Sequence, residues 1–307
     1  MIRRFRKWFL NSVAVATLKS LRWYVKNRSF SQVSQTGFHM GNLVFLLSRH
    51  NRRIIWENLE IGLGGTLTDQ DRYLIAKTVM QNLGRYVMEA MKIQDLSADN
   101  VKALVDAKQV KRQLKQTFDT GRSAMIITAH YSNWELFAAR LATIAPIKVL
   151  ARSSDNPEIN RMIVSSRNVA GVEVIDRDDR NAARIIRRIS KEGGQILGVL
   201  MDLDSVRVKS VFAPFLGVPA YTPSGPAVIA LKRWMDVYVG FMIHDPVSGY
   251  RLELTGPLNI QPSGNLSEDV LQVTTLFNAL ISDQIRKTPE QWAWIHRRWR
   301  RRPEDFQ

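Results

Sequence analysis

A histidine and a glutamate at positions 130 and 135 are the side chains of this sequence whose types and spacing best suit acid-base chemistry. An imidazole can take a proton from a hydroxyl near neutral pH, and a carboxylate can hold it in one tautomer and stabilise its charged form. We therefore predict that His130 is a general base and that Glu135 orients it. The alternative is a structural histidine beside a surface glutamate at a helix start, which has the same spacing.

The residues around this pair predict a strand, a turn and a helix. The apolar run at 124–128 is typical of a short buried strand, and a helix is expected to begin near Trp134. His130 then lies in the turn at the carboxyl end of a strand, where open α/β sheets bind ligands. Residues five apart on one helix lie about 140° apart and cannot touch, whereas a turn residue can meet Glu135. Ser132 or Asn133 is a natural N-cap for this helix.

The rest of the chain alternates between predicted helices and strands. A single helix is expected at 67–93 and another at 98–117, before the first strand. Later strands are predicted at 147–151, 172–175 and 195–201, and the helices between and after them at 157–169, 178–191, 226–233 and 267–287. Residues 237–243 and 250–254 predict an antiparallel pair, and a short tryptophan-rich helix follows Thr288. The pattern indicates an α/β fold, with a mainly parallel central sheet between two layers of helices.

The composition limits the chemistry. The chain has 307 residues, a formal net charge of +16 and no cysteine. Disulfides, thiolate nucleophiles and thiolate metal sites are therefore excluded, and five scattered histidines offer no metal-ligand spacing. We expect neither a metal nor a cofactor.

Both ends of the chain are basic, which predicts an anionic partner. No acidic residue precedes Glu57, and arginines near the C-terminus alternate with Trp292, Trp294 and Trp299. Because tryptophan rings favour the membrane interface and arginines favour headgroup phosphates, we expect an anionic membrane surface at these ends. The alternative is a basic nucleic-acid-binding protein, although no recognised nucleic-acid motif is present, so we expect no nucleic acid partner.

The first 28 residues are predicted to associate with the membrane, and residues 29–307 to form one domain. Residues 1–25 indicate a basic amphipathic helix lying on the bilayer surface, since the apolar run is shorter than the roughly 20 residues that a span requires. Lys19, Arg22 and Lys26 follow that run at once, which disfavours a cleaved signal peptide. The alternative is an ordinary helix packed on the domain.

Four ordered blocks resemble the lipid A late acyltransferases of the lysophospholipid acyltransferase superfamily. His130-Tyr-Ser-Asn-Trp-Glu135 resembles the family's His-x4-Asp/Glu motif. The other three blocks are Arg52, Arg53, Asn58 and Leu59; the segment from Phe212 to Thr222; and Pro289-Glu-Gln-Trp-Ala-Trp-Ile-His-Arg-Arg-Trp-Arg. The chain departs from the family at Asp202-Leu-Asp204, where members usually have Asp-Gln-Asp, and in lacking their clear N-terminal membrane-spanning helix.

The resemblance implies roles for particular residues. His130 is implied to be the general base and Glu135 its orienting carboxylate. Arg167 matches a functionally required arginine and would bind a phosphate or stabilise an oxyanion, with a solvated helix-face cation as the alternative. Asn133 and Arg152 are expected to contact the substrate.

The resemblance also implies an activity and a location. The enzyme would move an acyl chain from an acyl-carrier protein or coenzyme A thioester to a hydroxyl of a lipid A precursor. It would act at the cytoplasmic face of the inner membrane as a peripheral or monotopic protein. Another glycolipid, such as a phosphatidylinositol mannoside, or a lysophospholipid is the alternative acceptor.

Overall fold

A seven-stranded sheet forms the centre of the protein, in a computed structural model that describes residues 15–204 and 208–306. The strands lie in the order β1 (Val105–Asp106), β9 (Gly249–Thr255), β8 (Asp236–Asp245), β2 (Ala124–Thr128), β5 (Ile196–Leu200), β3 (Ile147–Ala151) and β4 (Val172–Asp176). Neighbouring strands are parallel except for β8 and β9, which form the predicted antiparallel pair. The mainly parallel sheet is therefore confirmed.

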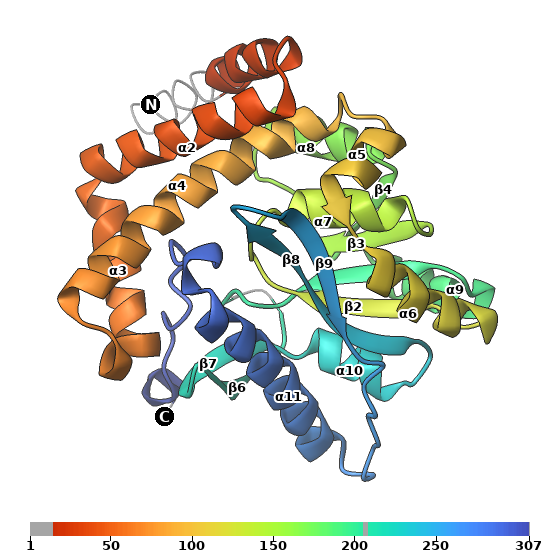
Figure 1. Ribbon diagram of the computed structural model, residues 1–307. Coiled ribbons are helices and arrows are strands. Elements are labelled where there is room, and N and C mark those ends of the chain that lie inside the picture. The colour runs from red at the N-terminus through yellow and green to blue at the C-terminus, as the bar shows by residue number, and fades with distance from the viewer. Residues whose placement is uncertain (1–14, 205–207, 307) are drawn as a thin grey trace, which may run out of the picture.

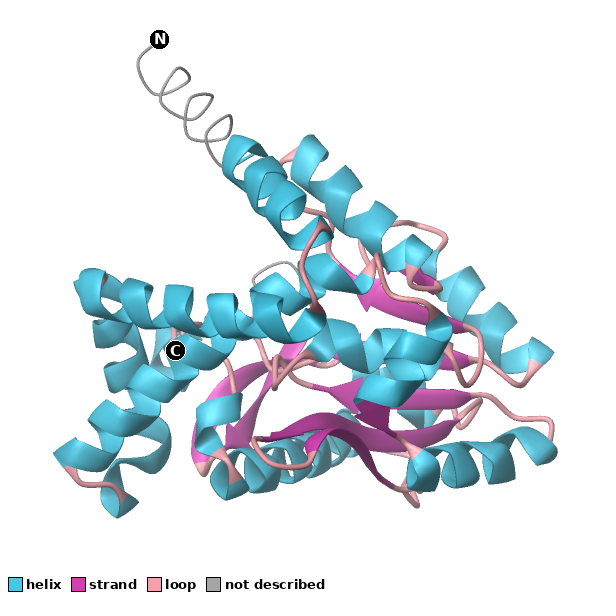
Figure 2. Ribbon diagram, turned by 45° about the horizontal axis from the view of Figure 1, so that its top comes forward, coloured by secondary structure: helices cyan, strands magenta, loops and turns pink. Residues whose placement is uncertain are grey.

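Helices cover both faces of this sheet, and the central strand shows why. Along β2, Ala124 and Ile126 belong to one hydrophobic cluster while Met125 and Ile127 belong to another, because successive side chains point to opposite faces. The first cluster includes α5 (Ala98–Leu104), α6 (Lys108–Asp119) and α7 (Trp134–Ala142). The second includes α9 (Ala182–Glu192), α10 (Gly225–Leu231) and α11 (Leu266–Lys287). Figure 2 shows the strands enclosed between helices.

Three consecutive helices extend from one side of this core (Figure 1): α2 (Phe30–Leu47), α3 (Arg49–Leu63) and α4 (Asp69–Ile93). Helices α2 and α4 cross at very close range through glycines. A Cβ built on Gly41 would lie 2.1 Å from the carbonyl oxygen of Met80, and one on Gly37 would lie 2.6 Å from the carbonyl oxygen of Gly84. Only glycine lets the two backbones approach this closely.

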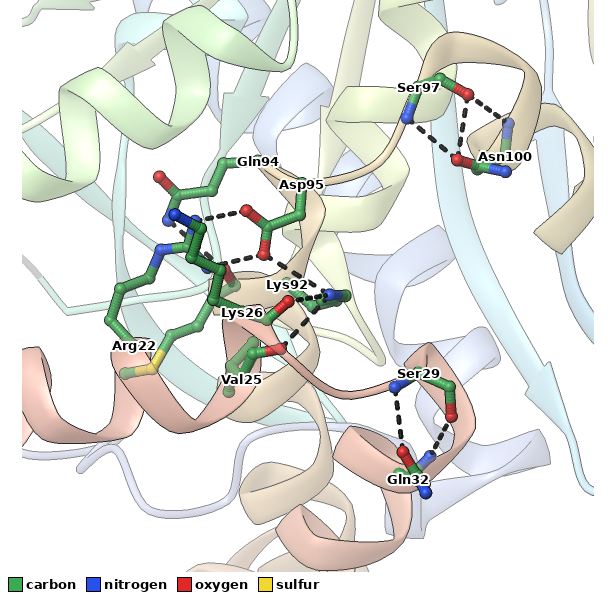
Figure 3. A network of polar contacts seen from close by, with 11 residues as sticks. Arg22, Val25, Lys26, Ser29, Gln32, Lys92, Gln94, Asp95, Ser97 and Asn100 are labelled. Atoms are coloured by element: carbon green, nitrogen blue, oxygen red, sulfur yellow. Dashed lines mark hydrogen bonds and ion pairs between the residues drawn. The ribbon is translucent and has the colours of Figure 1, made fainter.

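The helix at residues 15–26 packs against α4, as Figure 3 shows. Lys92 donates to the carbonyl oxygens of Val25 and Lys26 at 3.2 and 3.1 Å, which satisfies two acceptors at the end of this helix. Arg22 of the N-terminal helix also pairs with Asp95, which lies just after α4. This part therefore follows the alternative of a helix packed on the domain, while residues 1–14 of the predicted membrane helix lie outside the described residues. Across the described chain, no helix is long and apolar enough to span a bilayer.

Two sequence-based predictions need correction. The single helix expected at 98–117 is two helices, because Val105 and Asp106 pair with β9 and the Asp106 carboxylate accepts the backbone N–H of Lys108 at 3.0 Å. The predicted tryptophan-rich helix is only a short 3-10 turn, Pro289–Gln291. After this turn, Trp292 and Trp294 are buried in the core, so these rings are not available to a membrane.

One further helix, two short 3-10 turns and a hairpin complete the fold. Helix α8 (Pro157–Val169) packs on β4 and matches the prediction, and η1 (Gly64–Thr66) and η3 (Pro303–Phe306) are short 3-10 turns. The proline- and glycine-rich segment forms a separate antiparallel hairpin of β6 (Ser210–Phe215) and β7 (Val218–Pro223). This hairpin packs on α11 beside the C-terminal segment.

Candidate active site

His130 pairs with a buried aspartate on the neighbouring strand. Its Nδ1 lies 2.8 Å from Oδ1 of Asp202, and its backbone N–H donates to Oδ2 at 2.9 Å. Strands β2 and β5 are parallel with Thr128 opposite Leu200, so both residues stand two positions beyond the same register pair. Because the ionised Asp202 carboxylate accepts a hydrogen bond from the Nδ1–H, Nε2 of the neutral imidazole is left as the proton acceptor.

The sequence analysis missed Asp202 as a site residue, although a signal for it existed. It directly follows a predicted buried strand, as His130 does, and the carboxyl ends of neighbouring parallel strands meet at one edge of the sheet. Among the described residues no hydrogen bond joins Glu135 to His130, although the charge of Glu135 helps to raise the pKa of the imidazole. The carboxylate on the imidazole is that of Asp202.

The C-terminal segment fixes this pair from a third side. The indole Nε1 of Trp292 donates to Oδ2 of Asp202 at 2.8 Å, and Ala293 donates its backbone N–H to the carbonyl of His130 at 2.9 Å. Ser132 has a φ of 49°, and its N–H donates to the carbonyl of Gln291 at 2.7 Å. A non-glycine residue in this conformation is held by its surroundings. The turn that carries His130 is thus clamped by residues some 160 positions later.

Burial and charge act in opposite directions on the pair. Burial lowers the pKa of the His130 imidazole, but the charge and hydrogen bond of Asp202 outweigh burial and raise that pKa above its ordinary value of 6.5. Burial raises the pKa of Asp202, yet the His130 charge and the hydrogen bonds hold it well below its usual range. The side chain of Asp202 is fully buried, whereas that of His130 is 20% exposed. Asp202 therefore stays ionised while the imidazole reaches solvent or substrate.

Glu135 instead holds Arg167. The guanidinium Nε and Nη2 donate to the two carboxylate oxygens at 2.9 and 2.5 Å, in the bidentate geometry typical of strong arginine-carboxylate pairs. Arg167 comes from α8 and Glu135 from the first turn of α7, so the pair ties the two helices together. Nη1 of Arg167 has no partner among the residues that the structure describes.

Asn133 caps α7 from inside the protein. Its Oδ1 accepts the backbone N–H of Leu136 at 2.9 Å, and its Nδ2 donates to the buried Glu89 at 2.8 Å. Glu89 also accepts the Tyr250 hydroxyl at 2.6 Å. These contacts give Asn133 a structural role, and its expected contact with substrate stays a prediction. So does that of Arg152, which pairs with Asp155 at 2.6 Å on the surface.

An apolar cleft of about 660 Å³ opens beside Glu135 and Arg167. Trp134 lines it too, and its ring centroid lies 5.1 Å from that of His130. The apolar lining comes from the N-terminal helix, α4 and α8: Leu18, Val87, Ala90, Met91, Ile159, Met162 and Ile163. Its volume is in the range of about 300–1,000 Å³ found for small-molecule sites. The charged lining residues are Arg22, Glu135, Glu158, Arg161 and Arg167. A cleft with both charged groups and apolar side chains suits a ligand with a polar head and a hydrocarbon chain.

The other sequence blocks build the frame around this site. Asn58 on α3 donates to the carbonyl oxygens of Trp294 and His296 at 2.6 and 2.7 Å. Arg298, fully buried, donates to the carbonyl of Tyr221 at 2.7 Å and the hydroxyl of Thr222 at 2.5 Å. Each block thus holds the C-terminal segment in the position from which it contacts His130 and Asp202.

Known proteins are similar to this chain over most of its length. The family model described as bacterial lipid A biosynthesis acyltransferase matches residues 5–301. The lipid A biosynthesis palmitoleoyltransferase of Escherichia coli (strain K12) is 24% identical over 269 residues, which cover 87% of this chain and 84% of that protein. The lauroyltransferase of the same organism is 23% identical over 287 residues, 92% of this chain and 90% of that protein.

Proposed function

Since the chain belongs to the bacterial lipid A biosynthesis acyltransferase family and is therefore an acyltransferase, we propose that it moves a fatty acyl chain from an acyl thioester to a hydroxyl of a lipid A precursor. The observation that carries the proposal is the His130–Asp202 pair at the carboxyl edge of the sheet, next to the cleft that Glu135 and Arg167 line.

In the proposed reaction, Nε2 of His130 takes the proton of the acceptor hydroxyl as its oxygen attacks the thioester carbonyl. The charge that develops on the imidazole is stabilised by Asp202, which is ionised and hydrogen-bonded to Nδ1. The tetrahedral intermediate then expels the thiolate, which takes the proton from Nε2 of His130 and leaves the imidazole neutral again, and the new ester remains on the acceptor. No covalent enzyme intermediate is required, because a thioester is already activated.

Arg167 and Glu135 would act as one unit in this reaction. Glu135 fixes the guanidinium through Nε and Nη2, which would leave Nη1 of Arg167 to contact the substrate. A fixed cation of this kind stabilises a developing oxyanion or binds a substrate phosphate. This assignment revises the expected role of Glu135 from orienting the base to positioning the arginine.

The apolar cleft would hold the acyl chain. Its apolar lining includes Leu18, Met91, Ile159, Met162 and Ile163, and Glu135 and Arg167 line it next to Trp134. The chain would then point away from the reacting carbonyl between α4 and α8. The donor is proposed to be an acyl-carrier protein, an acidic partner that suits the net charge of +16, at the cytoplasmic face of the inner membrane.

The test is acyl transfer by the purified protein to a tetra-acylated lipid A precursor. Thioesters of acyl-carrier protein and coenzyme A with the same chain would be compared, and the product identified by mass spectrometry. General-base catalysis is worth about 10²–10⁴-fold, so His130→Ala should lose at least that much activity. His39→Ala, at an exposed histidine on α2, is the matched control. Full activity in a folded His130→Ala protein would refute the proposal.

A further inference from the structure

The last eight residues of α2 expose an apolar surface to solvent. Leu43, Leu46 and Leu47 are 55%, 57% and 74% exposed, and Met40 and Val44 are exposed beside them. The earlier part of the same helix is different, because its exposed residues are polar: Ser31, Gln32, Gln35 and His39. A cluster of apolar side chains exposed to solvent marks a contact site for a membrane or for another protein.

The orientation of this surface is fixed by the opposite face of the helix. Val33, Gly37, Gly41 and Phe45 are buried at intervals of four residues and pack on α4. The end of α2 is held as well, since Arg52 donates to the carbonyl oxygens of Phe45 and Leu46. Rotation of α2 could bury the leucines only by moving Gly37 and Gly41 away from the backbone of α4. The apolar stripe therefore faces outward as a permanent feature.

Basic residues follow the stripe. Arg49, His50 and Arg53 are exposed directly after α2, and the first acidic residue of the chain is Glu57, which pairs with Arg53. The helix at residues 15–26 runs alongside α2, where Tyr24 contacts Thr36 through their hydroxyls at 3.0 Å. This neighbour carries the exposed Trp23 and Lys26.

The combination fits a lipid bilayer better than a second copy of the chain. In a two-fold dimer the stripe would meet itself, and α2 carries no carboxylate that could pair with the arginines of the other copy. An anionic bilayer supplies both complements, since its interface accepts leucines and its headgroup phosphates accept guanidinium groups.

We propose that residues 40–47 of α2, with Arg49 and Arg53, form a docking surface for an anionic bilayer. The inference deepens the membrane association in the proposed function by naming the surface that makes the contact. Met40 lines a cavity together with Ala16 and Thr17 of the N-terminal helix, while Leu18 and Arg22 of that helix line the catalytic cleft. Docking through α2 would thus set the bilayer one helix away from the cleft.

Vesicle co-sedimentation of the full chain tests this proposal. The vesicles would contain phosphatidylcholine alone or with phosphatidylglycerol. The wild type would be compared with a double variant that carries both Leu43→Gln and Leu47→Gln. Because two leucines would leave the interface, binding to the anionic vesicles should weaken more than about tenfold. Leu271→Gln with Leu276→Gln is the matched control, since these leucines are exposed on α11. The control pair should bind as the wild type does.

Two further measurements separate the possible failures. His130→Ala should bind vesicles as the wild type does. The docking proposal can therefore hold even if the acyltransferase proposal fails. The α2 double variant should retain its melting temperature and its activity on acceptor dispersed in detergent, which excludes misfolding. Unchanged vesicle binding by that variant would overturn the proposal. The proposal would also be overturned if analytical ultracentrifugation showed a dimer for the wild type and a monomer for the double variant. The stripe would then be an interface between two copies of the chain.

Discussion

At the scale of single residues, the protein assigns two carboxylates to two different tasks. Asp202, fully buried, holds His130, and Glu135, partly exposed, holds Arg167. The two carboxylates sit on different elements, one beyond β5 and the other in the first turn of α7. The Asp202 carboxylate therefore holds the imidazole of His130, while the Glu135 carboxylate fixes the guanidinium of Arg167.

The pH dependence of the reaction should report the Asp202 charge. A base acts only when neutral, so kcat/KM should rise with pH through the raised pKa of His130, above 6.5. Asp202→Asn removes the charge that raises this pKa and leaves burial, which lowers it. The acid limb should therefore move to lower pH while the maximal rate falls. An acid limb that stays in place in Asp202→Asn would contradict the pairing.

The Glu135–Arg167 pair should behave as one unit in a double-mutant cycle. Glu135→Ala and Arg167→Ala should each lower kcat by about 10²-fold, because either change removes the fixed cation. The double variant should lose little more than each single variant, since the two effects share one cause. Additive losses in kcat would show that the residues act independently. Arg167→Lys should not restore activity, because lysine lacks the bidentate geometry.

At the scale of elements, the close crossing of α2 and α4 sets the position of the N-terminal part of the protein. α4 contacts α7, which carries Glu135, and also packs against the helix at residues 15–26. The glycine contact thus links the outer helices to the site.

Gly41→Ala should therefore destabilise the protein. The added Cβ would meet the Met80 carbonyl oxygen at 2.1 Å, and overpacking of this kind costs about 1–3 kcal/mol of unfolding free energy. Gly65→Ala is the control, because a Cβ there has open space around it. Chemical denaturation of both variants measures the difference. Equal stability would mean that α2 can move away from α4 without cost.

At the scale of the whole molecule, the basic C-terminal cluster divides into buried and exposed arginines. Arg298 is fully buried, stacks over the Phe215 ring at 4.6 Å and binds the hairpin, whereas the adjacent Arg297 is exposed. The net charge of the chain therefore overstates what the C-terminus offers to a membrane. Part of that charge is structural.

The two arginines should respond oppositely to truncation. Arg298→Ala leaves the Tyr221 carbonyl and Thr222 hydroxyl unpaired and should lower the unfolding free energy by about 1–3 kcal/mol. Arg297→Ala should change it by less than about 0.5 kcal/mol, as surface substitutions usually do. Thermal unfolding followed by circular dichroism makes the comparison. A similar loss in both variants would contradict the structural role of Arg298.

The sequence by itself determined most of the elements and the position of His130. Apolar periodicity predicted α8 at its observed ends and placed most strands, because a buried strand or an amphipathic helix leaves its pattern in consecutive residues. The same local pattern put His130 in a turn after a strand. It failed at residues 98–117, where Val105 and Asp106 pair with a strand that lies some 145 positions later.

Only the tertiary structure decided which groups meet. Asp202 lies 72 positions from His130 in the chain, and its partner Trp292 lies a further 90 positions on. Whether Trp292 and Trp294 faced a membrane or the core also depended on where the C-terminal segment packs. Local patterns record burial and turning, but they carry no information on which distant strand ends become neighbours. The order of strands in the sheet supplied that information, and with it the partner of His130.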